Sequence, residues 1–413
     1  MFNFILKKQF NVRLMAILLL GFTSGLPLAL TGSTMQAWFT EAHVNLMTIG
    51  ALSLIGIPYT LKFLWAPLMD HFTITSAGRR KSWILFMQAG VVVTLLVMAN
   101  MNPAAQPSAM SMVALAVAFF SASQDVAITA YQTDILQSEE RGLGAASYIF
   151  TYRLAALISG GLALVFADYI GWRLTYEIMA FTMLIAMIPT YLSPREKIIS
   201  STTNSIFATT GNALFDLLQR EKIMLLLLFI MFYKFGDALA LSLMTNFLLH
   251  GLGFSLTEVG LAYKLVSFVA TILGAFAGGA LLTRWNIFSA LLLFGLAQAF
   301  SNLMFVLLAI TGKQFFMMTS SIFIENFCSG LSTAALLAFM MSLCNTRYTA
   351  SQFALLSTVA SLGRVFLGPV AGLMVENLGW IQFYFWSFLL SFPGIILLLL
   401  LKNKVATYAH ATD

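Results

Sequence analysis

The chain has 413 residues, of which 60% are hydrophobic and only 9% charged, whereas a typical soluble domain carries about 25% charged residues. Too few polar side chains are present to cover such a chain in water, so the composition excludes a soluble globular protein. The formal net charge of +6 would suit a nucleic-acid-binding protein, but no basic cluster combines with aromatic residues in a motif that reads bases.

Apolar segments follow one another along the whole chain, and each is long enough to cross about 30 Å of hydrocarbon as a helix. The predicted spans are 14–34, 47–69, 83–101, 109–133, 144–167, 172–193, 222–248, 257–282, 287–310, 315–343, 350–374 and 380–401. The first span follows Lys7, Lys8 and Arg13 as in a signal peptide, but no small-residue cleavage site follows it. We therefore expect an all-α integral membrane protein with twelve transmembrane helices.

The cationic residues outside the spans are distributed very unevenly between the two sides of the membrane. With a cytoplasmic N-terminus, fifteen lysines and arginines lie on the cytoplasmic side, and only Arg173 and Lys313 lie on the other. Because loops rich in lysine and arginine stay in the cytoplasm, both termini are predicted to be cytoplasmic.

An internal repeat relates the two halves of the chain. The segment ending at Gly50 resembles the one ending at Gly260, and the ADYIGW ending at Trp172 resembles the VENLGW ending at Trp380. Because six helices return the chain to the same side, we expect two pseudo-symmetric six-helix bundles with a cavity between them near the midplane. The predicted domains are an N-terminal bundle 1–193, a cytoplasmic linker 194–221, a C-terminal bundle 222–404 and a cytoplasmic tail 405–413.

The loop after the second span reads LWAPLMDHFTITSAGRRKSW and resembles, with stretched spacing, the signature cytoplasmic loop of the major facilitator superfamily. A carboxylate such as Asp70 is stabilised at a helix N-terminus, here that of the eleventh predicted span, 350–374, by about 0.3–1 kcal/mol. The alternative is that the cations of this loop only set topology. A matching loop follows the fourth span. The predicted gating residues are Asp70, Arg79, Arg80, Asp134 and Arg141.

Charged residues also lie within the predicted spans, where a charge at the helix centre costs about 2.5–3.5 kcal/mol. Those well inside the spans are Lys62, Asp125, Arg153, Lys234, Asp237, Lys264, Glu325 and Arg364. Such residues are expected to face the bundle interior, either in function or in ion pairs that hold helices together. The five cations exceed the three anions, so the cargo is predicted to be anionic.

Proton coupling is predicted at Asp125, Arg153 and Glu325, because the spans contain no histidine and carboxylates are the remaining proton carriers. Asp125 and Arg153 lie 14 residues before and after Glu139, so antiparallel helices would place them at one depth and allow a salt bridge. A purely structural pairing is the alternative.

Amide and aromatic side chains in the spans are suited to sugar hydroxyls and ring faces, although single aromatic residues also serve as interfacial anchors. The predicted substrate-binding residues are Gln36, Tyr59, Lys62, Gln124, Tyr152, Lys234, Asp237, Lys264, Asn326 and Arg364. Lys234 and Asp237, three residues apart, are alternatively a self-neutralising pair. No nucleotide-binding loop, nucleophile motif or metal-ligand spacing is present, so we expect no enzyme, no cofactor and no metal.

Longer stretches resemble the muropeptide permease (AmpG) family of the major facilitator superfamily from end to end. The resemblance is carried by GFTSGLPLAL, TGSTMQAW, TIGALSLIGIPYTLKFLWAPLMD, FSASQDVAITAYQTDIL, YRLAALISGGLAL, YKFGDALALSL, ENFCSGLSTAALLAFMMSLCN, TASQFALLS and GRVFLGPVAG. It implies the major facilitator fold, and proton-driven import of N-acetylglucosaminyl-1,6-anhydro-N-acetylmuramyl peptides from periplasm to cytoplasm for peptidoglycan recycling.

The resemblance further implies a multi-pass protein of the bacterial inner membrane, in a family that influences β-lactamase induction where that circuit exists. A monomer is the default expectation. The proton gradient would be the energy source. Three alternatives stay open at this point: a carrier of another anionic solute such as an acyl-CoA, an efflux pump, and a membrane sensor that binds cell-wall fragments without moving them.

Overall fold

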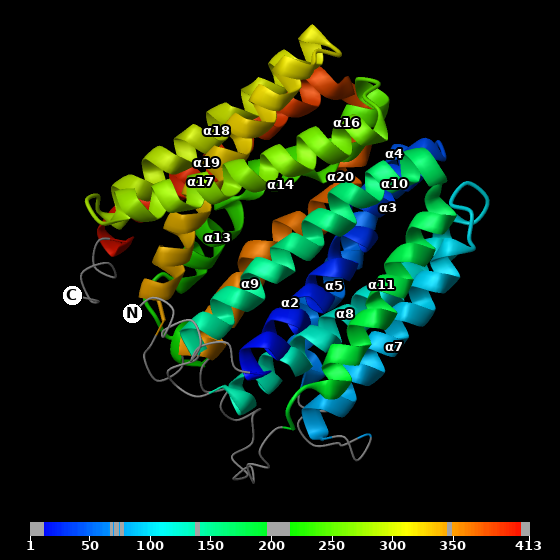
Figure 1. Ribbon diagram of the computed structural model, residues 1–413. Coiled ribbons are helices and arrows are strands. Elements are labelled where there is room, and N and C mark those ends of the chain that lie inside the picture. The colour runs from blue at the N-terminus through cyan, green and yellow to red at the C-terminus, as the bar shows by residue number, and fades with distance from the viewer. Residues whose placement is uncertain are drawn as a thin grey trace, which may run out of the picture. The chain divides into compact units, whose positions relative to one another are not determined.

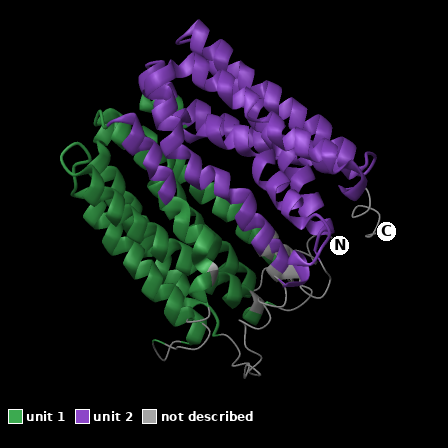
Figure 2. Ribbon diagram, turned by 180° about the vertical axis from the view of Figure 1, so that it is seen from behind, with its two compact units in different colours: residues 1–44, 55–201, 255–260 green, residues 45–54, 202–254, 261–413 purple. Residues whose placement is uncertain are grey.

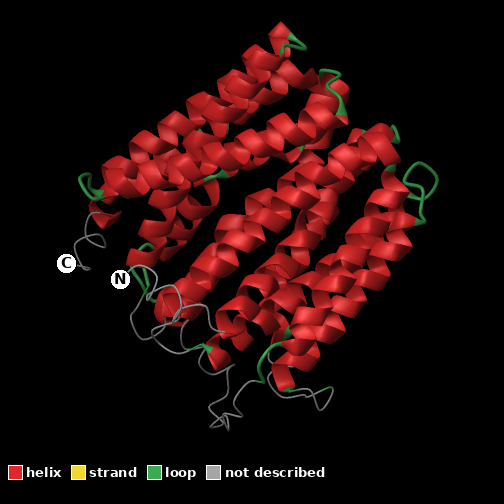
Figure 3. Ribbon diagram, viewed as in Figure 1, coloured by secondary structure: helices red, strands yellow, loops and turns green. Residues whose placement is uncertain are grey.

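The computed structural model describes residues 12–66, 69, 74, 78–136, 141–195, 215–344 and 349–405. These residues are overwhelmingly helical and include no strand (Figure 3). The predicted all-α class is therefore confirmed, and the apolar composition explains it, because a helix satisfies all its backbone hydrogen bonds internally in lipid. The predicted linker falls mostly outside the described residues, as do Asp70, Glu139 and most of the tail.

The first half of the chain forms a series of long helices and several short helical pieces (Figure 1). They are α2 (Val12–Thr31), α3 (Ser33–Glu41), α4 (Leu46–Ala51), η1 (Leu52–Gly56), α5 (Ile57–Leu61), η2 (Lys62–Leu64), α7 (Arg79–Ala99), α8 (Pro107–Ile135), α9 (Arg141–Leu157), η3 (Ile158–Leu162), α10 (Ala163–Ile170) and α11 (Trp172–Leu192).

The second half repeats this alternation of long helices and breaks. Its elements are α13 (Ile223–Tyr233), α14 (Phe235–Ser242), α15 (Met244–Asn246), η4 (Phe247–Gly251), α16 (Leu256–Glu258), η5 (Val259–Tyr263), α17 (Lys264–Leu282), α18 (Ile287–Thr311), α19 (Phe315–Ser342), α20 (Thr349–Leu389) and α21 (Phe392–Leu400).

Among the described residues, ten helical runs are long and apolar enough to cross a membrane. The second predicted span is a shorter apolar helix, Leu46–Leu61, interrupted by a 3-10 turn. The last two predicted spans lie within one run, Leu355–Leu400, in which Gly379 has φ 76° and marks the turn between them. A positive φ is accessible to glycine without steric cost. The helical segments are therefore consistent with the twelve predicted spans.

The chain divides into two compact units (Figure 2). Unit 1 comprises residues 1–44, 55–201 and 255–260, and unit 2 comprises residues 45–54, 202–254 and 261–413. Each unit thus consists mainly of one half of the sequence and includes a short segment of the other half. In unit 2, for example, Ser53 Oγ donates a hydrogen bond to the carbonyl oxygen of Val365 at 2.6 Å.

Small residues allow close helix packing inside each unit. In unit 1, a Cβ on Gly25 of α2 would overlap the backbone of Tyr152 on α9. In unit 2, a Cβ on Gly274 of α17 would overlap the backbone of Phe327 on α19. Without a hydrophobic driving force between helices in lipid, such close backbone approach is a main source of packing energy. These contacts fix the rotation of each helix, and so decide which polar side chains meet.

Candidate functional site

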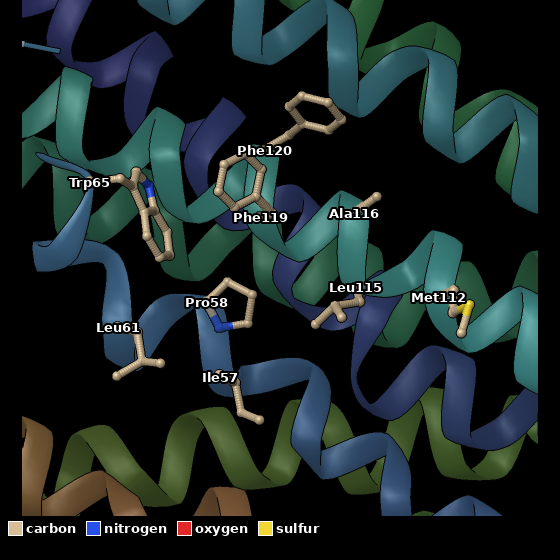
Figure 4. A pocket seen from close by; sticks show the side chains of 9 residues that line it. All are labelled: Ile57, Pro58, Leu61, Trp65, Met112, Leu115, Ala116, Phe119 and Phe120. Carbon is tan, nitrogen blue, oxygen red and sulfur yellow. The ribbon is translucent and has the colours of Figure 1, made fainter. Parts of the chain in front are cut away.

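A cavity of about 470 Å³ lies in unit 1 between α5 and α8 (Figure 4). Its walls are apolar and include Pro58, Trp65 and Phe119. Figure 4 shows these side chains around an opening with no charged group among the lining residues. Such a pocket offers neither cations nor amides to an anionic sugar-peptide, so the functional polar groups must be sought elsewhere.

Asp125 is the centre of a buried polar site in unit 1. The residue lies on α8 and is only 7% exposed. Ser24 Oγ on α2 donates a hydrogen bond to its Oδ1, and Lys62 Nζ lies 3.9 Å from its Oδ2. The serine hydroxyl has a single proton, so the Tyr148 hydroxyl, 2.7 Å from Ser24 Oγ, is the donor in that contact. A chain of hydrogen bonds therefore runs from α9 to the carboxylate.

The predicted salt bridge between Asp125 and Arg153 is wrong. The ion pairs between described residues include none from Arg153, whose side chain is exposed, and Lys62 is the partner of Asp125. The depth argument does not specify the direction in which a side chain points. Tyr152 lies at the glycine contact with α2, and one residue further on the α-helix has turned by about 100°, which points Arg153 elsewhere.

Other predicted residues of unit 1 surround this site or stabilise the bundle. The buried hydroxyl of Tyr59 has no hydrogen-bond partner among the described residues, and the rings of Tyr148 and Tyr152 lie 6.1 Å apart. Gln124 is fully buried and donates to Thr23 Oγ1 at 3.0 Å, so part of its hydrogen-bonding capacity serves packing. Gln36 is also buried.

The predicted gating residues are only partly described. Arg80 Nε lies 3.4 Å from Asp134 Oδ2, so the cation at the start of α7 pairs with the acid near the end of α8. Both side chains are largely buried, which favours a defined pair over a loosely solvated one. Arg79 is half-buried beside it. Asp70 and the side chain of Arg141 lie outside the described residues.

A second buried polar site lies in unit 2 around Lys234. This residue occupies the break between α13 and α14. Its Nζ lies 3.3 Å from Asp237 Oδ2 and donates to Ser332 Oγ at 2.7 Å, with further contacts to Ser329 at 3.1 and 3.2 Å. The ammonium is thus completely coordinated. This geometry agrees with the self-neutralising reading of the pair, and three of the four acceptor atoms come from α19.

Gln298 on α18 joins this pair to Glu325. Its Nε2 donates to Asp237 Oδ1 at 3.0 Å and to Glu325 Oε1 at 3.3 Å, while its Oε1 accepts from Ser332 Oγ at 3.2 Å. Glu325 is completely buried, and its Oε2 has no donor among the described residues. Two carboxyl groups and one ammonium therefore occupy one buried cluster on α13–α14, α18 and α19.

The remaining predicted cations of unit 2 are not paired in this way. Lys264, at the start of α17, lies 4.4 Å from the centre of the Tyr263 ring, and Arg364 on α20 is exposed. Neither has a carboxylate partner among the ion pairs of the described residues. Asn326 donates to the Ile322 carbonyl at 2.9 Å and accepts from Thr271 at 3.4 Å, so it joins α17 to α19.

Sequence reasoning missed several members of the two clusters. Ser24, Tyr148, Gln298, Ser329 and Ser332 were not among the candidates. A signal for Gln298 exists, because an amide in the middle of a strongly apolar span is costly and is expected to have a buried partner. The serines and the tyrosine carry no comparable signal, since such hydroxyls also satisfy themselves on the backbone of their own helix.

Comparison with known proteins gives consistent results. A sequence model of the Major Facilitator Superfamily matches residues 17–367. The anhydromuropeptide permease of Escherichia coli K12 is 45% identical over 398 residues, covering 96% of this chain and 81% of the permease. A putative AmpG transporter of Rickettsia felis is 32% identical and covers 96% of this chain and 98% of its own.

A solved structure, that of the nucleoside transporter NupG, has a similar fold. Its TM-score is 0.75 at 15% sequence identity, over 94% of this chain and 99% of the NupG chain. Identity at this level supports the fold alone.

Proposed function

Since the chain belongs to the anhydromuropeptide permease (AmpG) family of the major facilitator superfamily, and is a multi-pass membrane transporter rather than an enzyme, we propose that it imports anhydro-muropeptides. The cargo would be N-acetylglucosaminyl-1,6-anhydro-N-acetylmuramyl peptides, moved from periplasm to cytoplasm by alternating access and driven by a proton gradient. The observation that carries this proposal is the 45% identity to the Escherichia coli permease over 96% of the chain.

The cations left without carboxylate partners support an anionic cargo. Arg153, Lys264 and Arg364 lie in helices yet form no ion pair among the described residues. An arginine in lipid is costly, so such groups are expected along a water-filled path where they can bind anions. Muropeptides carry several peptide carboxylates, which these cations would bind. Arg153 was predicted to pair with Asp125 in proton coupling. Its position without an ion-pair partner among the described residues fits a cargo-binding role better.

Proton coupling is assigned in this proposal to Asp125 and Glu325. Both carboxyl groups are buried inside helix bundles, where the balance between charged and neutral forms depends strongly on the neighbouring charge. Asp125 has Lys62 as a partner that is 39% exposed in its side chain, so the pair can separate when cargo or water competes. No cofactor is required, since the gradient supplies the energy.

The expected setting is the bacterial inner membrane with both termini in the cytoplasm. The excess of lysine and arginine on one side supports this orientation. In this proposal the protein acts as a monomer.

The test is uptake of labelled anhydro-muropeptide into right-side-out membrane vesicles, with and without an imposed inward proton gradient. Accumulation against the cargo gradient is expected only with the proton gradient, and Asp125→Asn is expected to abolish that accumulation while leaving the protein in the membrane. Wild-type vesicles that bind muropeptide without internalising it would indicate a sensor. Vesicles that accumulate an acyl-CoA but no muropeptide would assign the protein to another anionic cargo.

A further inference from the structure

The cluster around Glu325 contains two carboxyl groups, those of Asp237 and Glu325, but one ammonium group, that of Lys234. Its one cation among the described residues, Lys234, directs its donors to Asp237, Ser329 and Ser332. None of these contacts reaches Glu325. If both carboxyl groups were ionised, Glu325 would be a fully buried anion whose only donor among the described residues is one amide hydrogen of Gln298 at 3.3 Å. A buried charge without a cation is strongly disfavoured in a membrane span.

The two carboxyl groups also lie too close together to be independent. Both accept from the same amide nitrogen of Gln298, Asp237 at 3.0 Å and Glu325 at 3.3 Å. Two carboxylates offer only acceptor atoms, so a hydrogen bond between them requires a proton on one of them. The Oε2 atom of Glu325, which has no donor among the described residues, is the position that such a proton would satisfy.

We propose that Asp237 and Glu325 share one exchangeable proton, that Glu325 carries it while Asp237 accepts its hydrogen bond, and that Gln298 is the positioning residue that holds the two groups together. The inference rests on the proposed proton-coupled transport and adds Asp237 and Gln298 to its machinery. Asp237 remains the anion because Lys234 and Ser329 already bind its Oδ2. The proton leaves Glu325 as H⁺ to water and returns the same way, with no other bond made or broken.

The other ionisable groups around the pair do not supply the missing charge. Tyr263 precedes α17, Cys328 lies on α19 and Tyr384 lies on α20, and each interacts electrostatically with Glu325. Phenols and thiols of this kind are neutral at neutral pH. From α18 the pair receives the two hydrogen bonds of the uncharged Gln298. Lys234 is therefore the cation that responds when the proton leaves.

Loss of the proton acts on a break in the helix. Lys234 has φ −106° and ψ 10°, outside helical values, between α13 and α14. After deprotonation, Asp237 and Glu325 repel each other and both attract the Lys234 ammonium. Because the backbone at Lys234 is not held by regular helical geometry, its displacement can change the angle between α13 and α14. A discontinuous helix at a charged site is a common location for coupling in transporters.

Infrared spectroscopy of the purified full-length protein in lipid tests the proton directly and needs no cargo. At neutral pH we expect the C=O band of a protonated carboxyl group, which disappears in Glu325→Gln. In Gln298→Leu the band is expected to shift, because the shared amide is lost. Gln88→Leu is the matched control, since Gln88 is an equally buried amide that donates to Thr23 and Thr190 rather than to carboxyl groups.

The outcomes separate this inference from the proposed function. A band that persists in Glu325→Gln and also in Asp237→Asn would overturn the shared proton, and equal spectra for Gln298→Leu and Gln88→Leu would overturn the positioning role. If Glu325→Gln fails to fold, Asp237→Asn provides the test instead. Because this variant removes the carboxylate that accepts the hydrogen bond from Glu325, the C=O band of Glu325 is expected to shift. Wild-type protein that shows the band yet transports no muropeptide would contradict the proposed cargo and leave the proton pair intact.

Discussion

The buried site of unit 1 contains one carboxylate and one ammonium, whereas that of unit 2 contains two carboxyl groups and one ammonium. The Asp125–Lys62 pair is long, at 3.9 Å, and its lysine is partly exposed. Lys234 is instead enclosed by Asp237 and two serines. Unit 1 therefore holds its anion by a few separable contacts, while unit 2 holds its cation by many contacts and leaves one carboxyl group without a cation partner.

Removing the cation from each site gives the largest expected contrast. Lys234→Ala leaves two buried carboxyl groups without a cation and should destabilise the protein by about 3–5 kcal/mol. Lys62→Ala should cost only about 1 kcal/mol, because its ammonium is partly solvated and distant. Unfolding in mixed micelles measures both. The double variant Lys234→Ala with Asp237→Asn should recover part of the loss, and equal losses for the two lysine variants would remove the distinction between the sites.

Removing a single hydroxyl should destabilise the protein more in the unit 1 site than in the unit 2 site, the reverse of the order expected for the two lysines. Ser24→Ala takes the hydroxyl donor from Asp125 and should cost about 1.5–3 kcal/mol, as expected for a hydrogen bond to a charged group. Ser332→Ala should cost about 1 kcal/mol or less, because Lys234 keeps Ser329 and Asp237. The same unfolding assay applies, with Ser111→Ala as the control, because the Ser111 hydroxyl donates to the Pro107 carbonyl of its own helix α8. A larger loss in Ser332→Ala would mean that the coordination of Lys234 is not redundant.

The smallest effect is expected at an exposed ion pair outside the spans. Lys404 Nζ bonds Glu221 Oε2 and, by this hydrogen bond and by its charge, lowers the pKa of Glu221. A carboxyl group whose pKa is lowered on folding stabilises the protein above its unfolded pKa, and this contribution is lost as the pH falls through the folded pKa. Lys404→Ala should therefore slightly flatten the acid side of the stability–pH curve. The small loss of stability relative to wild type should be present at neutral pH and vanish at acid pH, and a difference that grows as the pH falls would contradict this assignment.

The sequence alone was sufficient for the overall architecture. Long apolar segments, the asymmetry of Lys and Arg, and the turn at Gly379 between two spans all follow from local composition. The interruption of Leu46–Leu61 was harder to anticipate, since an apolar run predicts a span but not a break within it. The ionisable candidates were also identifiable, because any charge in a long apolar segment is conspicuous.

Composition and spacing identify the charged residues that lie within the membrane-spanning segments, whereas the packing of the helices decides which of these residues meet. Depth along a helix follows from counting residues, but the direction of a side chain depends on how each helix is rotated about its axis. That rotation is set by close contacts such as those of Gly25 and Gly274. For this reason Asp125 pairs with Lys62 rather than Arg153, and Gln298 joins Asp237 to Glu325 across three helical segments.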